Sequence, residues 1–122
     1  VLPRLETDLV DLFKGVANRN LSEMNTSFLL KVAASVMLVS GGYPDTYEKG
    51  KTITGLEESD ESIIFHAGTK TNEQNIVSNG GRVLAITSIA DTMEEALKAS
   101  YKKAEQIHFE GKYYRKDLGF DL

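Results

Sequence analysis

A stretch rich in glycine and proline, residues 40–51, places the strongest limit on how this chain can fold. It holds three glycines and one proline within twelve residues, a composition that regular helices and central strands do not accommodate. Apolar residues 36–39 precede the stretch and Ile53 follows it, which predicts a loop between two strands. Loops between core strands often carry binding groups, although composition alone favours a plain connector.

Length and composition exclude several classes of protein. A chain of 122 residues is large enough for one buried core, and its formal net charge of −4 argues against nucleic-acid binding, for which a basic face is expected. Cysteine is absent, so disulfides and cysteine-ligated metals are excluded. No apolar run approaches the ~20 residues of a membrane span, and no signal-peptide pattern is present. We therefore expect a cytoplasmic protein with no nucleic-acid and no membrane partner.

Strand patterns dominate the middle of the chain. Strands are expected at residues 28–39 (as one long strand or two short ones), 51–54, 62–67, 75–78 and 82–89. Asn79-Gly80 separates the last two and is a favoured sequence for a tight hairpin turn. Residues 62–67 and 82–89 carry apolar side chains on both alternating faces, which indicates burial on both sides, as in a barrel or sandwich. The acidic residues 57–61 are interpreted as a solvated turn.

Two helices are predicted, one on each side of this region. Apolar residues at helical spacing predict a helix at residues 7–18 with Thr7 as its N-cap, followed by a polar linker at residues 18–25. Thr92 and Glu95 have the spacing of a capping box, and an apolar face continues from there to about His108.

The predicted class is α+β, with an antiparallel, barrel-sandwich-like β core and one covering C-terminal helix. The aromatic and basic residues 113–117 are expected to form a short strand or a tail laid on the body. Arg115 and Asp117 are two residues apart in this segment, and we interpret them as a structural ion pair.

Five segments also resemble a known family, in the same order along the chain: residues 40–56, 65–69, 79–84, 91–96 and 107–117. Each is weak alone, but together they resemble the C-terminal region of phosphoribosylamine–glycine ligases, which belong to the ATP-grasp superfamily. The resemblance covers nearly the whole chain. It implies that residues 1–25 are the tail helix and linker of a preceding ATP-grasp domain, and that residues 26–122 are the C-terminal domain. A first residue other than methionine fits a piece of a longer chain.

The resemblance implies a carbon–nitrogen ligase of purine biosynthesis. In this family ATP phosphorylates the carboxylate of glycine, and the amine of phosphoribosylamine attacks the acyl phosphate. The products are glycinamide ribonucleotide, ADP and phosphate. ATP and magnesium are expected to bind mainly to the upstream ATP-grasp domain, with no cofactor in this piece. The piece is expected to help position the phosphoribosyl substrate and to be inactive alone.

Gly80, Gly81 and Arg82 are the first candidates for a binding site. Glycines let backbone N–H groups approach an anion, and arginine adds a planar fork of donors. The alternative is that the glycines only serve the turn and that Arg82 is a solvated charge. Related ATP-grasp enzymes of purine synthesis hold a ribose phosphate with basic side chains on this hairpin. The predicted substrate-binding residues are Arg82, Gly80, Gly81, Lys70, Thr69 and Lys49, with no catalytic residue and no metal ligand.

Two non-catalytic interpretations stay open at this point. A strand-rich domain of this size can be a stand-alone binding module, such as a carrier of biotin or lipoate on a hairpin lysine. The expected tip, residues 79–81, contains no lysine, which counts against a carrier. A structural interface domain is the other possibility.

Overall fold

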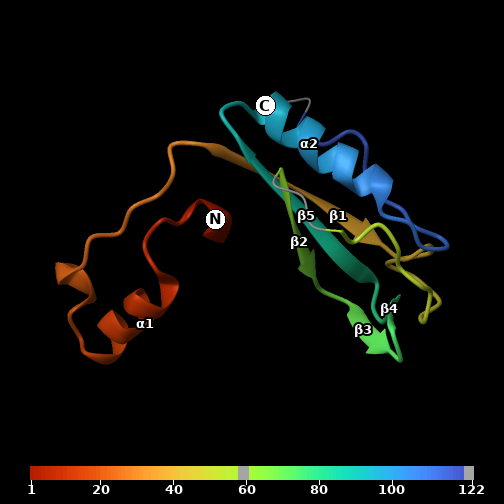
Figure 1. The fold of residues 1–122 in the computed structure, drawn as a ribbon, viewed down its shortest axis with the longest axis horizontal. Coiled ribbons are helices and arrows are strands. Elements are labelled where there is room, and N and C mark those ends of the chain that lie inside the picture. The colour runs from red at the N-terminus through yellow and green to blue at the C-terminus, as the bar shows by residue number, and fades with distance from the viewer. Residues whose placement is uncertain (58–60, 120–122) are drawn as a thin grey trace.

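A three-stranded antiparallel sheet with a helix on one face forms the centre of the computed structural model, which describes residues 1–57 and 61–119 (Figure 1). A two-stranded sheet extends from one end of it, and the N-terminal residues form a separate arm. The elements in chain order are the 3-10 helix η1 (Leu2–Arg4), α1 (Leu9–Ala17), the 3-10 helix η2 (Leu21–Glu23), β1 (Val32–Val39), β2 (Ser62–His66), β3 (Thr69–Asn72), β4 (Asn75–Ser78), β5 (Arg82–Ala90) and α2 (Met93–Gln106). The predicted α+β class with an antiparallel core and a covering helix is confirmed, whereas the barrel-sandwich detail stays a prediction.

Strand β5 lies between β1 and β2 and pairs antiparallel with both. Ile86 is opposite Val36 on one side and Ile64 on the other. The strand predicted at residues 82–89 is therefore confirmed, and so is its burial on both faces, since most of its side chains are buried. The strand at residues 75–78 is confirmed as β4.

Two expectations for the strands are wrong. The segment 28–31 does not join β1, and Leu30 is almost completely exposed. Residues 51–54 form only isolated bridges, from Thr52 to Val77 and from Thr54 to His108.

Strand β2 has the predicted position, but its outer face is exposed to solvent. Ile63 is 44% exposed and Phe65 is 43% exposed.

The predicted hairpin at Asn79-Gly80 is also wrong. Strand β4 pairs with β3 instead, through a turn at residues 73 and 74 in which Glu73 adopts a positive φ of 56°. Both edges of β5 are occupied by β1 and β2, so β4 cannot pair with it. Asn79 and Gly80 therefore connect two different sheets.

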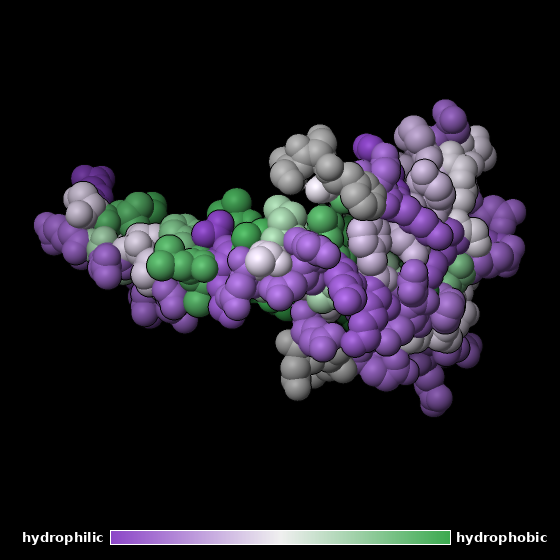
Figure 2. Space-filling view, turned by 90° about the horizontal axis from the view of Figure 1, so that it is seen from above, coloured by the Kyte–Doolittle hydropathy of each residue, from purple (hydrophilic) through white to green (hydrophobic). Residues whose placement is uncertain are grey.

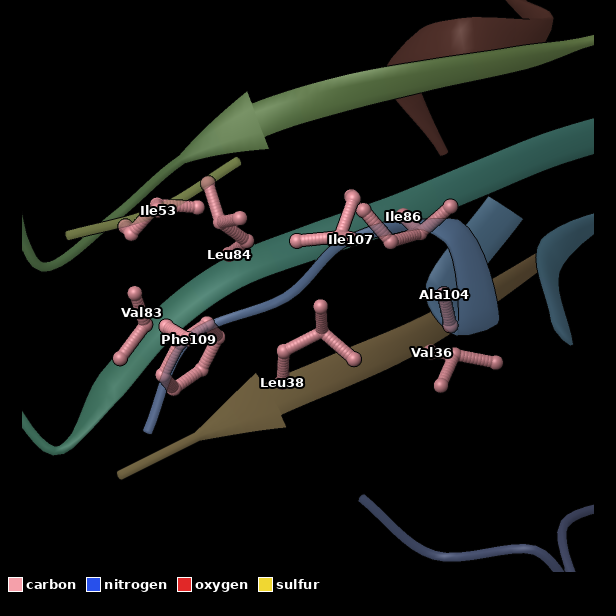
Figure 3. Close-up of a cluster of buried hydrophobic side chains, with 9 residues drawn as sticks. All are labelled: Val36, Leu38, Ile53, Val83, Leu84, Ile86, Ala104, Ile107 and Phe109. Carbon is pink, nitrogen blue, oxygen red and sulfur yellow. The ribbon is translucent and has the colours of Figure 1, made fainter. Parts of the chain in front are cut away.

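Helix α2 covers the sheet as predicted, and the hydroxyl of Thr92 caps it by accepting a hydrogen bond from the N–H of Glu95 at 3.2 Å. Its buried face meets side chains of β1, β5 and the segment that follows the helix (Figure 3). The main core cluster consists of Val36, Leu38, Ile53, Val83, Leu84, Ile86, Ala104, Ile107 and Phe109. Burying these apolar side chains supplies most of the driving force for folding.

Three buried serines connect the helix to the sheet. The hydroxyl of Ser100 on α2 donates to the carbonyl oxygen of Ala34 on β1 at 2.9 Å, and Ser100 Oγ also lies 2.9 Å from Ser88 Oγ on β5. Ser88 Oγ also lies 2.7 Å from Ser62 Oγ on β2. All three strands are thus joined to the helix by one hydrogen-bonded cluster, as expected for buried polar groups.

The N-terminal helix is shorter than predicted and has a different cap. It spans Leu9–Ala17, and Asp8 is its N-cap, accepting hydrogen bonds from the N–H groups of Val10 and Asp11. Thr7 Oγ1 accepts instead from the N–H of Ser27 at 2.8 Å. Helix α1 packs mainly against η2, which lies within the predicted linker. Figure 2 shows the N-terminal residues as an arm that projects from the body and carries hydrophobic surface.

The C-terminal segment lies along the outer edge of β1. Tyr113 forms a bridge with Val39, and the predicted ion pair is confirmed, because both guanidinium contacts from Arg115 to Asp117 are short, at 2.9 and 2.7 Å. Arg115 lowers the pKa of Asp117, mainly through this hydrogen bond. Lys112 donates to the carbonyl oxygen of Ala104 in the last turn of α2.

Part of the predicted acidic turn, residues 58–60, lies outside the described residues. Its two ends are held by α2, since Lys103 donates to the carbonyl oxygen of Glu57 at 2.6 Å and Lys102 pairs with Glu61 at 3.2 Å. In residues 1–57 and 61–119, no helix is both long and apolar enough to cross a bilayer.

The core model predicts very different costs for two isoleucines in neighbouring strands. Ile86 is fully buried and Ile63 is 44% exposed. Ile86→Ala should lower the free energy of unfolding by about 2–5 kcal/mol, because it leaves a cavity in the core. Ile63→Ala should lower it by less than about 1 kcal/mol, since much of its side chain is already solvated. Urea denaturation of both variants measures the difference, and equal losses would contradict the assigned faces of the sheet.

Candidate functional site

The loop at residues 40–51 and the turn at residues 79–82 lie against each other, although they are far apart in the sequence. The N–H of Ser40 donates to the carbonyl oxygen of Gly81 at 2.8 Å, and Ser40 Oγ donates to that of Gly80 at 2.9 Å. The ring of Tyr43 lies so close to Gly81 that a Cβ at this position would overlap it. Glycine at position 81 is therefore a steric requirement.

A second glycine contact holds the other side of the same turn. Gly68, between β2 and β3, donates its N–H to the carbonyl oxygen of Arg82 at 2.9 Å, and its own carbonyl accepts from the N–H of Asn79 at 2.7 Å. A Cβ on Gly68 would lie 2.5 Å from the Arg82 carbonyl oxygen and 2.8 Å from Gly80 Cα. The two backbones can approach this closely only because both positions lack side chains. The contact brings Thr69, the next residue after Gly68, beside the turn.

The far end of the 40–51 loop reaches the end of β4. The N–H of Gly50 donates to the carbonyl oxygen of Ser78 at 2.7 Å, and the N–H of Lys51 donates to Ser78 Oγ at 3.1 Å. Lys49, one residue earlier, is thereby held next to the start of the 79–82 turn. One end of the loop therefore contacts the turn itself, through Ser40, and the other end contacts Ser78, the residue before the turn.

In the turn, the backbone carbonyl oxygens are hydrogen-bonded, whereas two of the N–H groups have no acceptor among the described residues. The carbonyl oxygens of Gly80, Gly81 and Arg82 all accept hydrogen bonds, from Ser40 twice and from Gly68. The N–H groups of Gly80 and Gly81 donate none to the part of the chain that the structure describes. Gly81 is buried, and a buried N–H without an acceptor is unfavourable. The consecutive N–H groups of half-buried Gly80 and buried Gly81 can together bind an anion.

Three cationic side chains near this turn are exposed and have no hydrogen bond or ion pair with any described residue: those of Arg82, Lys70 and Lys49. Lys51 differs, because its ammonium group contacts Glu48 at 2.7 Å and Glu110 at 3.0 Å. These carboxylates, Glu48 first, raise the pKa of Lys51. Lys51 is thus used to fix the loop, whereas the other three are available to a ligand.

Thr69, the remaining candidate, has a structural partner. Thr69 Oγ1 lies 2.9 Å from His66 Nδ1, which agrees with the interpretation of His66 as a hydrogen-bonded structural residue. Lys70 is opposite Val77 in the β3–β4 pair, so it stands one position further from the turn than Thr69. The structure therefore brings Gly80, Gly81, Arg82 and Thr69 together most directly, while Lys70 and Lys49 lie at the border.

Three residues that shape the turn were not predicted from the sequence: Ser40, Gly68 and Ser78. Gly68 had a detectable signal, since an isolated glycine between two strand patterns often marks a close approach of two backbones. Ser40 and Ser78 had none, because their partners lie at least 27 residues away.

No metal centre is found among the described residues, and two grooves of the domain lie outside the set of predicted binding residues. No group of three or more histidine, aspartate or glutamate side chains among them could hold a metal ion, so we assign no metal-dependent step to them. Grooves of about 690 Å³ at residues 112–117 and of about 330 Å³ along β1 and the C-terminal segment include none of the predicted binding residues.

Comparisons with known proteins agree with the resemblance. The model of the family described as "Phosphoribosylglycinamide synthetase, C domain" matches residues 33–121. The bifunctional purine biosynthetic protein purD of Dictyostelium discoideum is 47% identical over 98% of this chain and 15% of its own length. The phosphoribosylamine–glycine ligase of Halalkalibacterium halodurans is 42% identical over 98% of this chain.

This chain spans only 28% of the length of the Halalkalibacterium ligase. A crystal structure of the phosphoribosylamine–glycine ligase from Thermotoga maritima superposes with a TM-score of 0.70 and 38% identity, over 86% of this chain and 27% of that one. The family model, the relatives that match nearly the whole chain and the similar fold all agree. The chain therefore belongs to the phosphoribosylglycinamide synthetase C-domain family.

Proposed function

We propose that this chain acts as the C-terminal domain of a phosphoribosylamine–glycine ligase, and that its 79–82 turn binds the phosphate of the phosphoribosyl substrate. The observation that carries the proposal is the pair of unpartnered N–H groups of Gly80 and Gly81 beside the unpaired guanidinium of Arg82. Backbone donors and a fork of N–H groups are the two features that proteins combine to hold phosphate oxygens. Lys70 and Lys49 at the border add positive charge.

In this proposal the complete ligase joins glycine to phosphoribosylamine with ATP. The γ-phosphoryl group passes to the glycine carboxylate, the amine of phosphoribosylamine attacks the acyl phosphate, and phosphate leaves as the C–N bond forms. This chain performs none of these bond changes. It holds the phosphate end of the substrate so that the amine is directed at the acyl carbon. Orientation of this kind lowers the barrier by several kcal/mol, and by about 7–11 kcal/mol in the best cases.

The phosphate proposal has a direct kinetic test in the complete ligase that contains this chain. Arg82→Ala removes a charge-assisted contact and should raise KM for phosphoribosylamine about ten- to hundredfold. KM for glycine and for ATP should change much less. Arg82→Lys should recover only part of the loss, because an ammonium group cannot form the bidentate fork.

Lys98→Ala is the matched control for Arg82→Ala. Lys98 is an exposed cation on α2 without a partner among the described residues, and its removal should leave all three KM values unchanged. If folded Arg82→Ala ligase keeps the KM for phosphoribosylamine of the unaltered enzyme, Arg82 is only a solvated charge and the phosphate assignment fails.

ATP and magnesium belong, in this proposal, to the part of the ligase outside this chain. We therefore expect the 122-residue chain to show no saturable heat of ATP binding in calorimetry with magnesium present, and to form no glycinamide ribonucleotide alone. The complete ligase, titrated in the same way, is the positive control. Tight ATP binding by the short chain would overturn this division of roles.

Residues 1–25 belong, in the same proposal, to the domain that precedes this one. The supporting observation is the apolar stripe of α1, in which Val10, Phe13 and Val16 are 59, 62 and 58% exposed. The family model begins only at residue 33. Phe13 should be oxidised by hydroxyl radicals much faster in the 122-residue chain than in the complete ligase, with buried Phe109 as a reference that reacts little in both. Equal oxidation of Phe13 would contradict the packing of this stripe on another domain.

A carrier function is not supported. The hairpin tip that the structure does contain, residues 72–75 between β3 and β4, has no lysine to carry a cofactor.

A further inference from the structure

Ser40 is a buried residue whose two donors both face the 79–82 turn. Its side chain and backbone are 4% exposed. Its N–H reaches the carbonyl oxygen of Gly81 and its hydroxyl reaches that of Gly80, at 2.8 and 2.9 Å. One residue therefore fixes two consecutive carbonyl groups.

The orientation of these carbonyls determines where the neighbouring N–H groups point. The peptide bond between Gly80 and Gly81 is trans, and in a trans peptide the C=O and N–H bonds point in opposite directions. With the Gly80 carbonyl directed at Ser40, the N–H of Gly81 must point away from Ser40. The same holds for the Gly81 carbonyl and the N–H of Arg82. Without Ser40, glycine residues have the conformational freedom to turn a carbonyl toward a bound anion, which would repel it.

Tyr43 holds the same turn by contact. Its ring lies against Gly81 Cα, and its N–H donates to the carbonyl oxygen of Ser40 at 3.1 Å, which closes the turn that connects the two residues. The ring is further supported by Tyr47, whose ring centroid is 6.1 Å away. The phenol oxygen of Tyr43 has no hydrogen bond to a described residue, so the ring, rather than the hydroxyl, makes the contact.

We infer that Ser40 and Tyr43 are positioning residues, which hold the N–H group of Gly81 toward the substrate phosphate. This inference rests on the proposed function of the turn. Neither residue touches the phosphate. Ser40 directs the two carbonyls inward, and the Tyr43 ring prevents Gly81 from rotating. The Ser-Gly-Gly-Tyr sequence at residues 40–43 is then part of the phosphate site, although it lies about 40 residues from Arg82.

Steady-state kinetics of the complete ligase test the inference. Ser40→Ala should raise KM for phosphoribosylamine about three- to tenfold, the effect of one lost hydrogen bond, with kcat and the KM values for glycine and ATP nearly unchanged. Ser40→Thr keeps the hydroxyl and should recover part of the loss. Tyr43→Phe should behave like the unaltered enzyme, whereas Tyr43→Ala should raise the same KM because the ring is lost.

Ser100→Ala is the matched control for a buried serine. Its hydroxyl also donates to a carbonyl oxygen, that of Ala34, and its hydrogen-bond partners, Ala34 and Ser88, belong neither to the 79–82 turn nor to the 40–51 loop. It should destabilise the domain as Ser40→Ala does and leave KM for phosphoribosylamine unchanged. If Ser40→Ala ligase does not fold, the Tyr43→Phe and Tyr43→Ala pair decides in its place.

The possible outcomes separate this inference from the function on which it rests. If Arg82→Ala raises KM for phosphoribosylamine while Ser40→Ala and Tyr43→Ala do not, the positioning role is overturned and the phosphate site stands. If Arg82→Ala has no effect, the phosphate site itself fails. If Ser40→Ala lowers kcat and raises all three KM values together, and not that for phosphoribosylamine alone, its role is only structural and the inference is overturned.

Discussion

The central position of β5 is the constraint on which the rest of this domain depends. Because β1 and β2 occupy both of its edges, the strand that precedes it in the chain has no free edge to pair with and forms a separate sheet with β3. The chain must then cross from one sheet to the other within residues 79–81. That crossing passes directly over Gly68, and it leaves the peptide groups of Gly80 and Gly81 outside both ladders. Two donors without strand partners are the direct result of this topology.

Features set by local chemistry were predictable from the sequence. The Thr92 cap, the length of α2 and the position of β5 follow from side chains within a few residues of each other. Features set by distant partners were not. The Asn79-Gly80 pair has ideal hairpin chemistry, yet the hairpin lies at Glu73, which adopts a left-handed conformation that is uncommon for a non-glycine residue. The outer face of β2 looked like a buried face, because alternation reports side-chain type and not whether another layer is present.

The candidate site was predicted in part for the same reason. Gly80, Gly81 and Arg82 were recognisable because a short motif with a known chemistry contains all three. Lys70 and Lys49 stay predicted binding residues, whereas Lys51, in the same loop as Lys49, is held by Glu48 and Glu110. Nothing in the spacing of two lysines around a glycine distinguishes a free cation from a paired one. That distinction depends on Glu110, which approaches from beyond the end of α2.

The cluster of Ser62, Ser88 and Ser100 gives the helix a single axial position on the sheet. Contacts among alanine, leucine and isoleucine alone would change little if α2 slid by one turn, about 5.4 Å, since one apolar side chain can replace another. Hydroxyl groups do not permit such an exchange, because each needs its partner at a defined distance and direction. A displaced helix would take the Ser100 hydroxyl away from Ser88 Oγ and from the carbonyl oxygen of Ala34, and leave it buried without these partners. These directional hydrogen bonds therefore select one position of α2 on the sheet, which hydrophobic contacts alone would not select.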